Sequence, residues 1–262
     1  MNRDINTGRV ILFTNENGAA VFKAIKSLGM NVLVVIPESK KDIYKWTAAL
    51  PANDKLVFSA SDRQHAINDM QVFSPDLFVS VAYPNILKAD MLNVPRYGGV
   101  NLHGGRLPQY RGANVLNWAM INGEKSTAMT IHYMDAGIDT GPVIDAIEVP
   151  ILFEDTALSL RDKMREATIK LIEKCVPDLV KEKISATAQD ERQAKYWKKR
   201  QPEDGLFAWD ESSINIYNKI RALVGAFGGA HYLQGSKKVL VNSFMTYEEV
   251  CAEKIKRGFF GK

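Results

Sequence analysis

The chain has 262 residues, enough for one large domain or for one domain with a small addition. Charged residues make up 24% and the formal net charge is only +4, which argues against a dedicated nucleic-acid binder with a concentrated basic stripe. The N-terminus is polar, and every apolar run is too short to span a bilayer. We therefore expect a cytoplasmic protein that binds neither DNA nor membrane.

The two cysteines, Cys175 and Cys251, stand far apart in the sequence. They have neither the spacing of a metal site nor that of a disulfide framework. We expect free thiols in a reducing compartment, and no metal.

A strand–helix–strand pattern opens the chain. Residues 9–14 and 32–36 are short apolar runs, as in parallel strands that are covered on both faces. Residues 19–28 carry apolar side chains at helical spacing. The turn after the first strand reads TNENGA and has one glycine, so it lacks the three-glycine fingerprint of dinucleotide-binding proteins. The pattern predicts a Rossmann-like fold that does not bind NAD.

The next elements extend this α/β pattern. Strands are expected at residues 55–58, 77–82, 97–102, 127–134 and 142–149, and helices at 62–73 and 113–122. Asp62 is the expected cap of the first of these helices. A long amphipathic helix is expected at 156–184, kinked or split by Pro177. The predicted fold is a mostly parallel sheet with helices on both faces.

The character of the sequence changes after residue 185. A helix is expected at 212–223, with Ile214, Tyr217, Ile220 and Leu223 facing inward. Two strands, at 230–233 and 237–242, are joined by a short turn. We predict a catalytic domain at 1–195 and a small C-terminal α+β lobe at 196–262 that is accessory or forms a dimer.

Three polar side chains are expected at the ends of adjacent strands. Asn101 and His103 are two residues apart, so strand alternation points them to one side. Asp139 lies on the loop after the next strand, where a carboxylate can orient the imidazole. An amide donor can stabilise an oxyanion, and the group suits acyl transfer between two bound substrates. His132 and Asp135 are rival candidates, which we interpret as structural or peripheral.

The segments NLHGGRLPQYRGANVLNWAMINGE, at 101–124, and TIHYMDAGIDTGPVI, at 130–144, resemble the family of N10-formyltetrahydrofolate-dependent formyltransferases. The family includes glycinamide ribonucleotide, methionyl-tRNA and nucleotide-sugar formyltransferases. By this resemblance the catalytic residues are Asn101, His103 and Asp139. Asp139 is preferred to Asp135 because the family's aspartate precedes the Thr-Gly or Ala-Gly of this loop.

The resemblance also implies where the substrates bind. The folate is expected against two loops, and the amine acceptor against two others. The implied folate-binding residues are Tyr83, Asn85, Ile86, Leu87, Asp135, Gly137 and Ile138. The implied acceptor-binding residues are Asn15, Asn17, Gly105, Arg106, Tyr110 and Arg111.

Three classes of acceptor compete. The resemblance implies a complete barrel and a basic loop in methionyl-tRNA enzymes, whereas the region after residue 200 is short. Glycinamide ribonucleotide enzymes end soon after the long helix. The stretch PEDGLFAW, at 202–209, resembles a segment shared by sugar and tRNA enzymes. We therefore favour a dTDP- or GDP-linked 3-amino or 4-amino dideoxysugar, used for a surface polysaccharide such as O-antigen, and a homodimer.

One position argues against a particular sugar. In enzymes that act on 4-amino-arabinose, an arginine usually follows the YRG motif, and here the position is Ala113. The alternatives are a methionyl-tRNA formyltransferase, a hydrolase that releases formate from the same folate, and a non-catalytic module that binds folate or a nucleotide.

Overall fold

The computed structural model describes residues 7–182, 184–225, 228–241 and 243–259. Contacts group the chain into two units. The first runs up to His103 and includes Met129–Ile147 and Glu166–Arg192; the second comprises Gly104–Ala128, Glu148–Arg165 and the chain from Gln193 onward. The units interleave along the chain, and the boundary at residue 195 stays a prediction.

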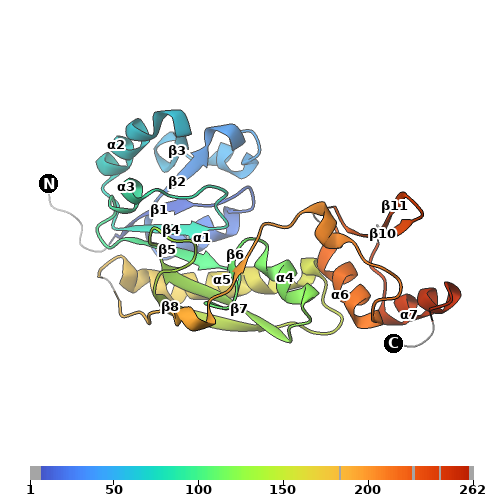
Figure 1. The fold of residues 1–262 in the computed structure, drawn as a ribbon. Coiled ribbons are helices and arrows are strands. Elements are labelled where there is room, and N and C mark those ends of the chain that lie inside the picture. The colour runs from blue at the N-terminus through green and yellow to red at the C-terminus, as the bar shows by residue number, and fades with distance from the viewer. Residues whose placement is uncertain (1–6, 183, 226–227, 242, 260–262) are drawn as a thin grey trace. The chain divides into compact units, whose positions relative to one another are not determined.

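The helices and strands follow one another as Figure 1 traces them from blue to red. Their bounds are β1 Arg9–Phe13, α1 Ala19–Ser27, β2 Asn31–Pro37, β3 Lys55–Phe58, α2 Arg63–Phe73, β4 Leu77–Val81, α3 Ala89–Leu92, β5 Gly99–His103, β6 Arg111–Gly112, α4 Val115–Ile121, β7 Ser126–Tyr133, β8 Val143–Pro150, α5 Ala157–Leu179, β9 Tyr196–Trp197, α6 Ser213–Leu223, β10 Ala230–Gln234, β11 Lys237–Val241 and α7 Tyr247–Lys256.

Seven strands form one sheet in the order β3-β2-β1-β4-β5-β7-β8. The strands from β3 to β5 are parallel, and β7 runs antiparallel to β5. The predicted α/β fold with a mostly parallel sheet is confirmed. Strands β2 and β3 lie on one side of β1, and β4 and the strands after it lie on the other side. The direction in which strands are added to the sheet therefore reverses between β1 and β4. Ligands bind beyond the carboxyl ends of strands at such a reversal.

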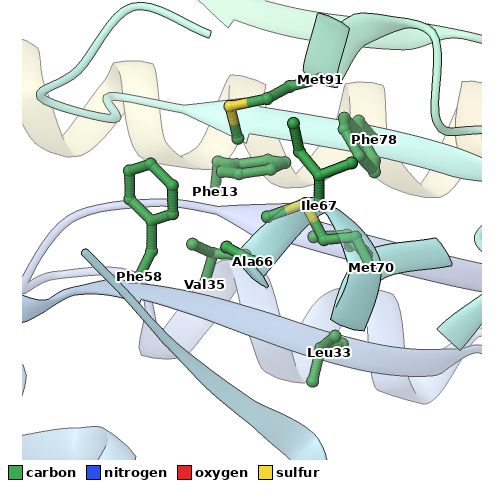
Figure 2. Close-up of a cluster of buried hydrophobic side chains, with 10 residues drawn as sticks. Phe13, Leu33, Val35, Phe58, Ala66, Ile67, Met70, Phe78 and Met91 are labelled. Atoms are coloured by element: carbon green, nitrogen blue, oxygen red, sulfur yellow. The ribbon is translucent and has the colours of Figure 1, made fainter. Parts of the chain in front are cut away.

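One face of the sheet packs against α2 and α3 through a buried apolar cluster (Figure 2). Its members come from β1, β2, β3, β4 and the two helices: Ile11, Phe13, Leu33, Val35, Phe58, Ala66, Ile67, Met70, Phe78 and Met91. The alternate residues of the central strands, such as Val10, Val34 and Val79, are also fully buried. Both faces are therefore covered, which explains why these strands are continuously apolar.

Three local expectations need correction. The side chain of Asp62 makes no capping hydrogen bond, although the residue occupies the N-cap position. Helix α5 continues through Pro177 and ends at Leu179, so the split is excluded, while the kink stays a prediction. Ile214 is 38% exposed, and Ile216 takes the inward position on α6. Helix α7 was not predicted.

The C-terminal strands β10 and β11 form the expected antiparallel hairpin. Asn242, the last residue of the predicted second strand, lies outside the described residues, as do residues 1–6 of the predicted catalytic domain. Within the described part of the chain, every helix is too short or too polar to cross a membrane.

Gly141, in the loop between β7 and β8, packs closely against the backbone of Tyr133. A Cβ atom on Gly141 would overlap the carbonyl oxygen of Tyr133, a backbone atom that cannot move aside without opening the loop. A Cβ atom on Gly104 would meet only the flexible Met164 side chain at 3.7 Å.

We expect Gly141→Ala to lower the free energy of unfolding by about 1–3 kcal/mol, the usual cost of forcing extra atoms into a packed site. Gly104→Ala is the control and should cost far less. Urea denaturation of the two variants and the wild type measures the difference, and equal stability of the two variants would contradict this view of the loop.

Candidate active site

Four polar side chains meet at strands β5 and β7. Asn101 and His103 lie on β5, and the antiparallel register places His132 of β7 directly opposite Asn101. The two imidazoles are nearly buried, with 7% of His103 and 2% of His132 exposed. The rings stand edge to face, with their centroids 6.4 Å apart.

Asp139 enters this group from the loop that connects β7 to β8. Its Oδ2 lies 3.4 Å from His103 Nδ1, and its Oδ1 lies 3.3 Å from Asn101 Nδ2 and 3.6 Å from His132 Nε2. The Asp139 side chain is only 11% exposed. A buried carboxylate is costly unless polar partners surround it, and the Asn101 amide and the His103 imidazole supply them. The structure thus brings together the three predicted catalytic residues, although their roles remain predictions.

His132 orients the amide of Asn101. Its Nδ1 lies 2.8 Å from the Tyr133 carbonyl oxygen, which can only accept a hydrogen bond. The proton of a neutral imidazole is therefore on Nδ1, which leaves Nε2 as an acceptor for Asn101 Nδ2 at 3.3 Å. This contact agrees with a structural histidine, although the sequence did not identify Asn101 as its partner. The antiparallel pairing of β5 with β7 is the signal that could have revealed it.

Asp135 faces its own loop. Its Oδ1 accepts hydrogen bonds from Gly137 N at 3.0 Å and from Thr140 Oγ1 at 2.5 Å. This is the usual way in which an aspartate closes a turn. Asp139, and not Asp135, is the aspartate beside the imidazoles.

Two cavities lie in the first unit. One, of about 470 Å³, is lined by four of the predicted folate-binding residues, Tyr83, Asn85, Ile86 and Leu87. Its other walls combine apolar side chains, including Phe58 and Met91, with the basic Arg63 and Lys88.

The second cavity, of about 450 Å³, is lined by Asp135 together with Leu92 and Met134. Gly137 and Ile138 follow on the same loop, and Ile138 is 53% exposed. The predicted folate-binding residues therefore lie in three places: four line the first cavity, Asp135 lines the second, and Gly137 and Ile138 lie on the loop that follows.

Tyr83 has a hydroxyl group without a satisfactory partner. Its oxygen is buried, and among the described residues no hydrogen bond to it meets the usual geometry. Burial raises the pKa of Tyr83, while Asn85 acts in the opposite direction. The hydroxyl therefore stays protonated at neutral pH and remains a potential donor to a bound molecule.

The predicted acceptor-binding residues of the first unit, Asn15 and Asn17, lie on the loop after β1. Asn15 Oδ1 accepts a hydrogen bond from Asn17 N at 2.9 Å, and the Asn15 carbonyl accepts one from Gly18 N at 3.0 Å. Asn15 therefore shapes this loop, while the Asn17 side chain is exposed.

The other predicted acceptor-binding residues lie in the second unit. Arg106 is exposed and donates to Ser126 and Glu148 at 2.9 and 3.0 Å. Burial raises the pKa of Tyr110 to about 12, and its hydroxyl donates to Glu124. Both side chains are engaged with the protein's own groups.

Arg111 differs from the prediction. Its side chain is completely buried, and its Nη1 donates to Tyr196 Oη at 2.9 Å across the pairing of β6 with β9. A side chain without exposed surface cannot contact a ligand in this conformation. Gly105, next to Arg106 in the sequence, is buried as well.

We expect the neutral form of His132 to carry its proton on Nδ1, because the Tyr133 carbonyl oxygen beside this nitrogen can only accept a hydrogen bond. Long-range ¹H–¹⁵N NMR distinguishes the two nitrogens of each imidazole. His65, which is exposed, serves as the comparison and should show the mixture typical of a solvated ring. A proton on Nε2 of His132 would contradict the proposed contact with Asn101.

The sequence matches known proteins over most of its length. The profile of the formyl transferase family matches residues 4–176. The bifunctional polymyxin resistance protein ArnA of Wigglesworthia glossinidia brevipalpis is 34% identical over 251 residues, which cover 89% of this chain. The match spans only 37% of that relative's length.

Solved structures share the fold at lower identity. A 4-N formyltransferase from Francisella tularensis has a TM-score of 0.75 and 18% identity, with 91% of this chain and 98% of the other covered. An N-formyltransferase from Helicobacter canadensis has a TM-score of 0.68 and 19% identity, with 83% and 81% covered. Because the profile match extends over well more than half of the sequence, the chain belongs to the formyl transferase family.

Proposed function

We propose that the protein transfers a formyl group from N10-formyltetrahydrofolate to the amine of a nucleotide-linked 3-amino or 4-amino dideoxysugar. The observation that carries this proposal is the arrangement of the Asn101 amide, the His103 imidazole and the Asp139 carboxylate in one cluster, in which the imidazole and the carboxylate are nearly buried. An amide donor, a proton-transfer group and an orienting charge are what direct transfer between two bound substrates requires.

Each of these side chains has a distinct task in the reaction. When bound, the folate supplies an activated formyl group. The neutral amine attacks the formyl carbon, a new C–N bond forms, and the bond to the folate nitrogen breaks. Asn101 Nδ2 can donate to the oxygen on which negative charge builds up, because its present hydrogen bonds of 3.3 Å are long and easily exchanged.

His103 is the group placed to move the proton. The proton lost by the amine passes through the imidazole, or through a water molecule beside it, to the leaving nitrogen. Asp139 Oδ2, at 3.4 Å, stabilises the imidazole in its charged form and holds its orientation. A nearly buried site strengthens these interactions, because little water is present to screen them.

The cavities support a folate as the donor. The cavity bounded by Tyr83 and Leu87 has an apolar and aromatic wall with a few polar groups, the usual composition of a site for a small ring system. The Helicobacter canadensis protein was crystallised with folinic acid and dTDP-3-aminofucose. This relative supports both halves of the proposal, the folate and the nucleotide-linked amino sugar.

The cellular setting belongs to the same proposal. The enzyme would act in the cytoplasm as a homodimer, on an acceptor destined for a surface polysaccharide. The region 196–262 would serve as an accessory lobe beside a catalytic domain at 1–195. We expect Arg106 and Tyr110 to line the acceptor side, with the buried Arg111 supporting that region through Tyr196.

The first test is a panel of acceptors. Purified protein is incubated with N10-formyltetrahydrofolate and a set of dTDP- and GDP-linked 3-amino and 4-amino dideoxysugars, and products are identified by mass spectrometry. We expect one sugar to gain a formyl group. Methionyl-tRNA and a reaction without acceptor are run in parallel. Formylation of the tRNA alone would identify a methionyl-tRNA formyltransferase, and release of formate alone would identify a hydrolase. Binding of folate or nucleotide without turnover would identify a non-catalytic module. Each of these outcomes would overturn the proposal.

The second test removes the catalytic groups. We expect His103→Ala and Asp139→Asn to lower kcat by about 10²–10⁴-fold, the range for loss of general acid–base assistance. Binding of the nucleotide sugar, measured by calorimetry, should change little because neither side chain is needed for it. Asp69→Asn, at a partly exposed aspartate of α2 that lies beside His65, is the control. Wild-type rates in both variants would refute the assignment.

A further inference from the structure

The backbone of Asp139 adopts an unfavourable conformation. Its φ is +55°, in the left-handed region that residues other than glycine rarely occupy. Such a conformation persists only when surrounding groups hold it in place. The carboxylate between the imidazoles and Asn101 therefore depends on whatever secures this loop.

Gln189 makes two hydrogen bonds to this loop. Its Nε2 donates to the carbonyl oxygen of Asp139 at 2.8 Å and to that of Gly141 at 2.7 Å. Both partners can only accept, so the NH₂ end of the amide, with its two hydrogens, must face the loop. One side chain thus fixes the carbonyl groups on both sides of Thr140.

The segment that carries Gln189 is itself attached to the same region. Thr187 and Val143 exchange two backbone hydrogen bonds, of 2.8 and 2.7 Å, in an antiparallel bridge. This register places Gln189 opposite Gly141. The Tyr133 hydroxyl donates to the Ile184 carbonyl at 3.1 Å and adds a further attachment. Gln189 therefore acts from an anchored backbone.

We infer that Gln189 is a positioning residue for the formyl transfer: its amide clamps the loop that aims the Asp139 carboxylate at His103. The inference rests on the proposed function for its effect on rate. It adds a residue some fifty positions away in sequence from the aspartate that it positions. Without the two donors, the loop loses its restraint and the carboxylate is held less well against the imidazole.

The test removes the donors without changing charge. Gln189→Met keeps the length of the side chain, and Gln189→Ser leaves the two carbonyls to water. The control is Gln71→Met, at an exposed glutamine on α2. Circular dichroism and thermal unfolding establish that each variant is folded before it is used.

We expect kcat of both Gln189 variants to fall at least about tenfold, because small misplacements of a catalytic group have effects of this size or larger. The KM for the acceptor sugar should stay near the wild-type value. The acidic limb of the pH profile for kcat should move to lower pH, since a carboxylate that is held less well stabilises the charged imidazole less. Gln71→Met should match the wild type in kcat, in the KM for the acceptor sugar and in the pH profile.

A second readout is independent of turnover. NMR titration of the His103 ring should give a lower midpoint in Gln189→Met than in the wild type, and an unchanged midpoint in Gln71→Met. If the wild type transfers formyl groups and the Gln189 variants keep its kcat and its His103 midpoint, the clamp is refuted and the proposed function stands. If the wild type formylates none of the acceptors, the proposed function fails, and an unshifted midpoint would still refute the clamp.

Discussion

The position of one carboxylate determines most of what this site can do. Asp139 lies within 3.6 Å of His103, His132 and Asn101, and it is nearly removed from water. A carboxylate in such a place is stable only with polar partners on several sides. The strand that carries Asn101 and His103, the strand that carries His132 and the loop of Asp139 must therefore keep their relative positions.

The change of strand direction at β5 makes this arrangement possible. The strands from β3 to β5 are parallel and send their carboxyl ends to one edge of the sheet. Strand β7 runs the other way, so His132, the residue before the last of β7, pairs with Asn101 in the middle of β5. The loop after β7 then returns to deliver Asp139. A purely parallel continuation would have required a crossover between these two strands.

The loop is stabilised by several small contributions. Asp135 accepts two hydrogen bonds within the loop, Gly141 permits the close approach to the Tyr133 carbonyl, and Gln189 holds two carbonyl groups from outside. Together they offset the unfavourable backbone of Asp139. A strained residue at a proposed catalytic position is consistent with a geometry selected for chemistry and not for stability.

Local pattern predicted the strands and helices well, because continuous apolar runs and helical periodicity are properties of neighbouring residues. Three of its gaps share one cause. The orientation of Ile214, the burial of Arg111 and the contact of His132 with Asn101 depend on what packs against these side chains, and those partners are remote in sequence. Gln189 escaped notice for the same reason, since its two acceptors lie about fifty residues away.

The sequence by itself determined the α/β class, the absence of the three-glycine dinucleotide turn and the grouping of an amide, an imidazole and a carboxylate on two neighbouring elements. These follow from residue type and spacing, which fold locally in the same way in many settings. The family resemblance favoured Asp139 over Asp135, but only the tertiary structure showed how the two carboxylates lie: Asp139 faces the imidazoles, and Asp135 closes its own turn. These positions depend on strand register and on hydrogen bonds from a distant segment, which residue type and spacing do not specify.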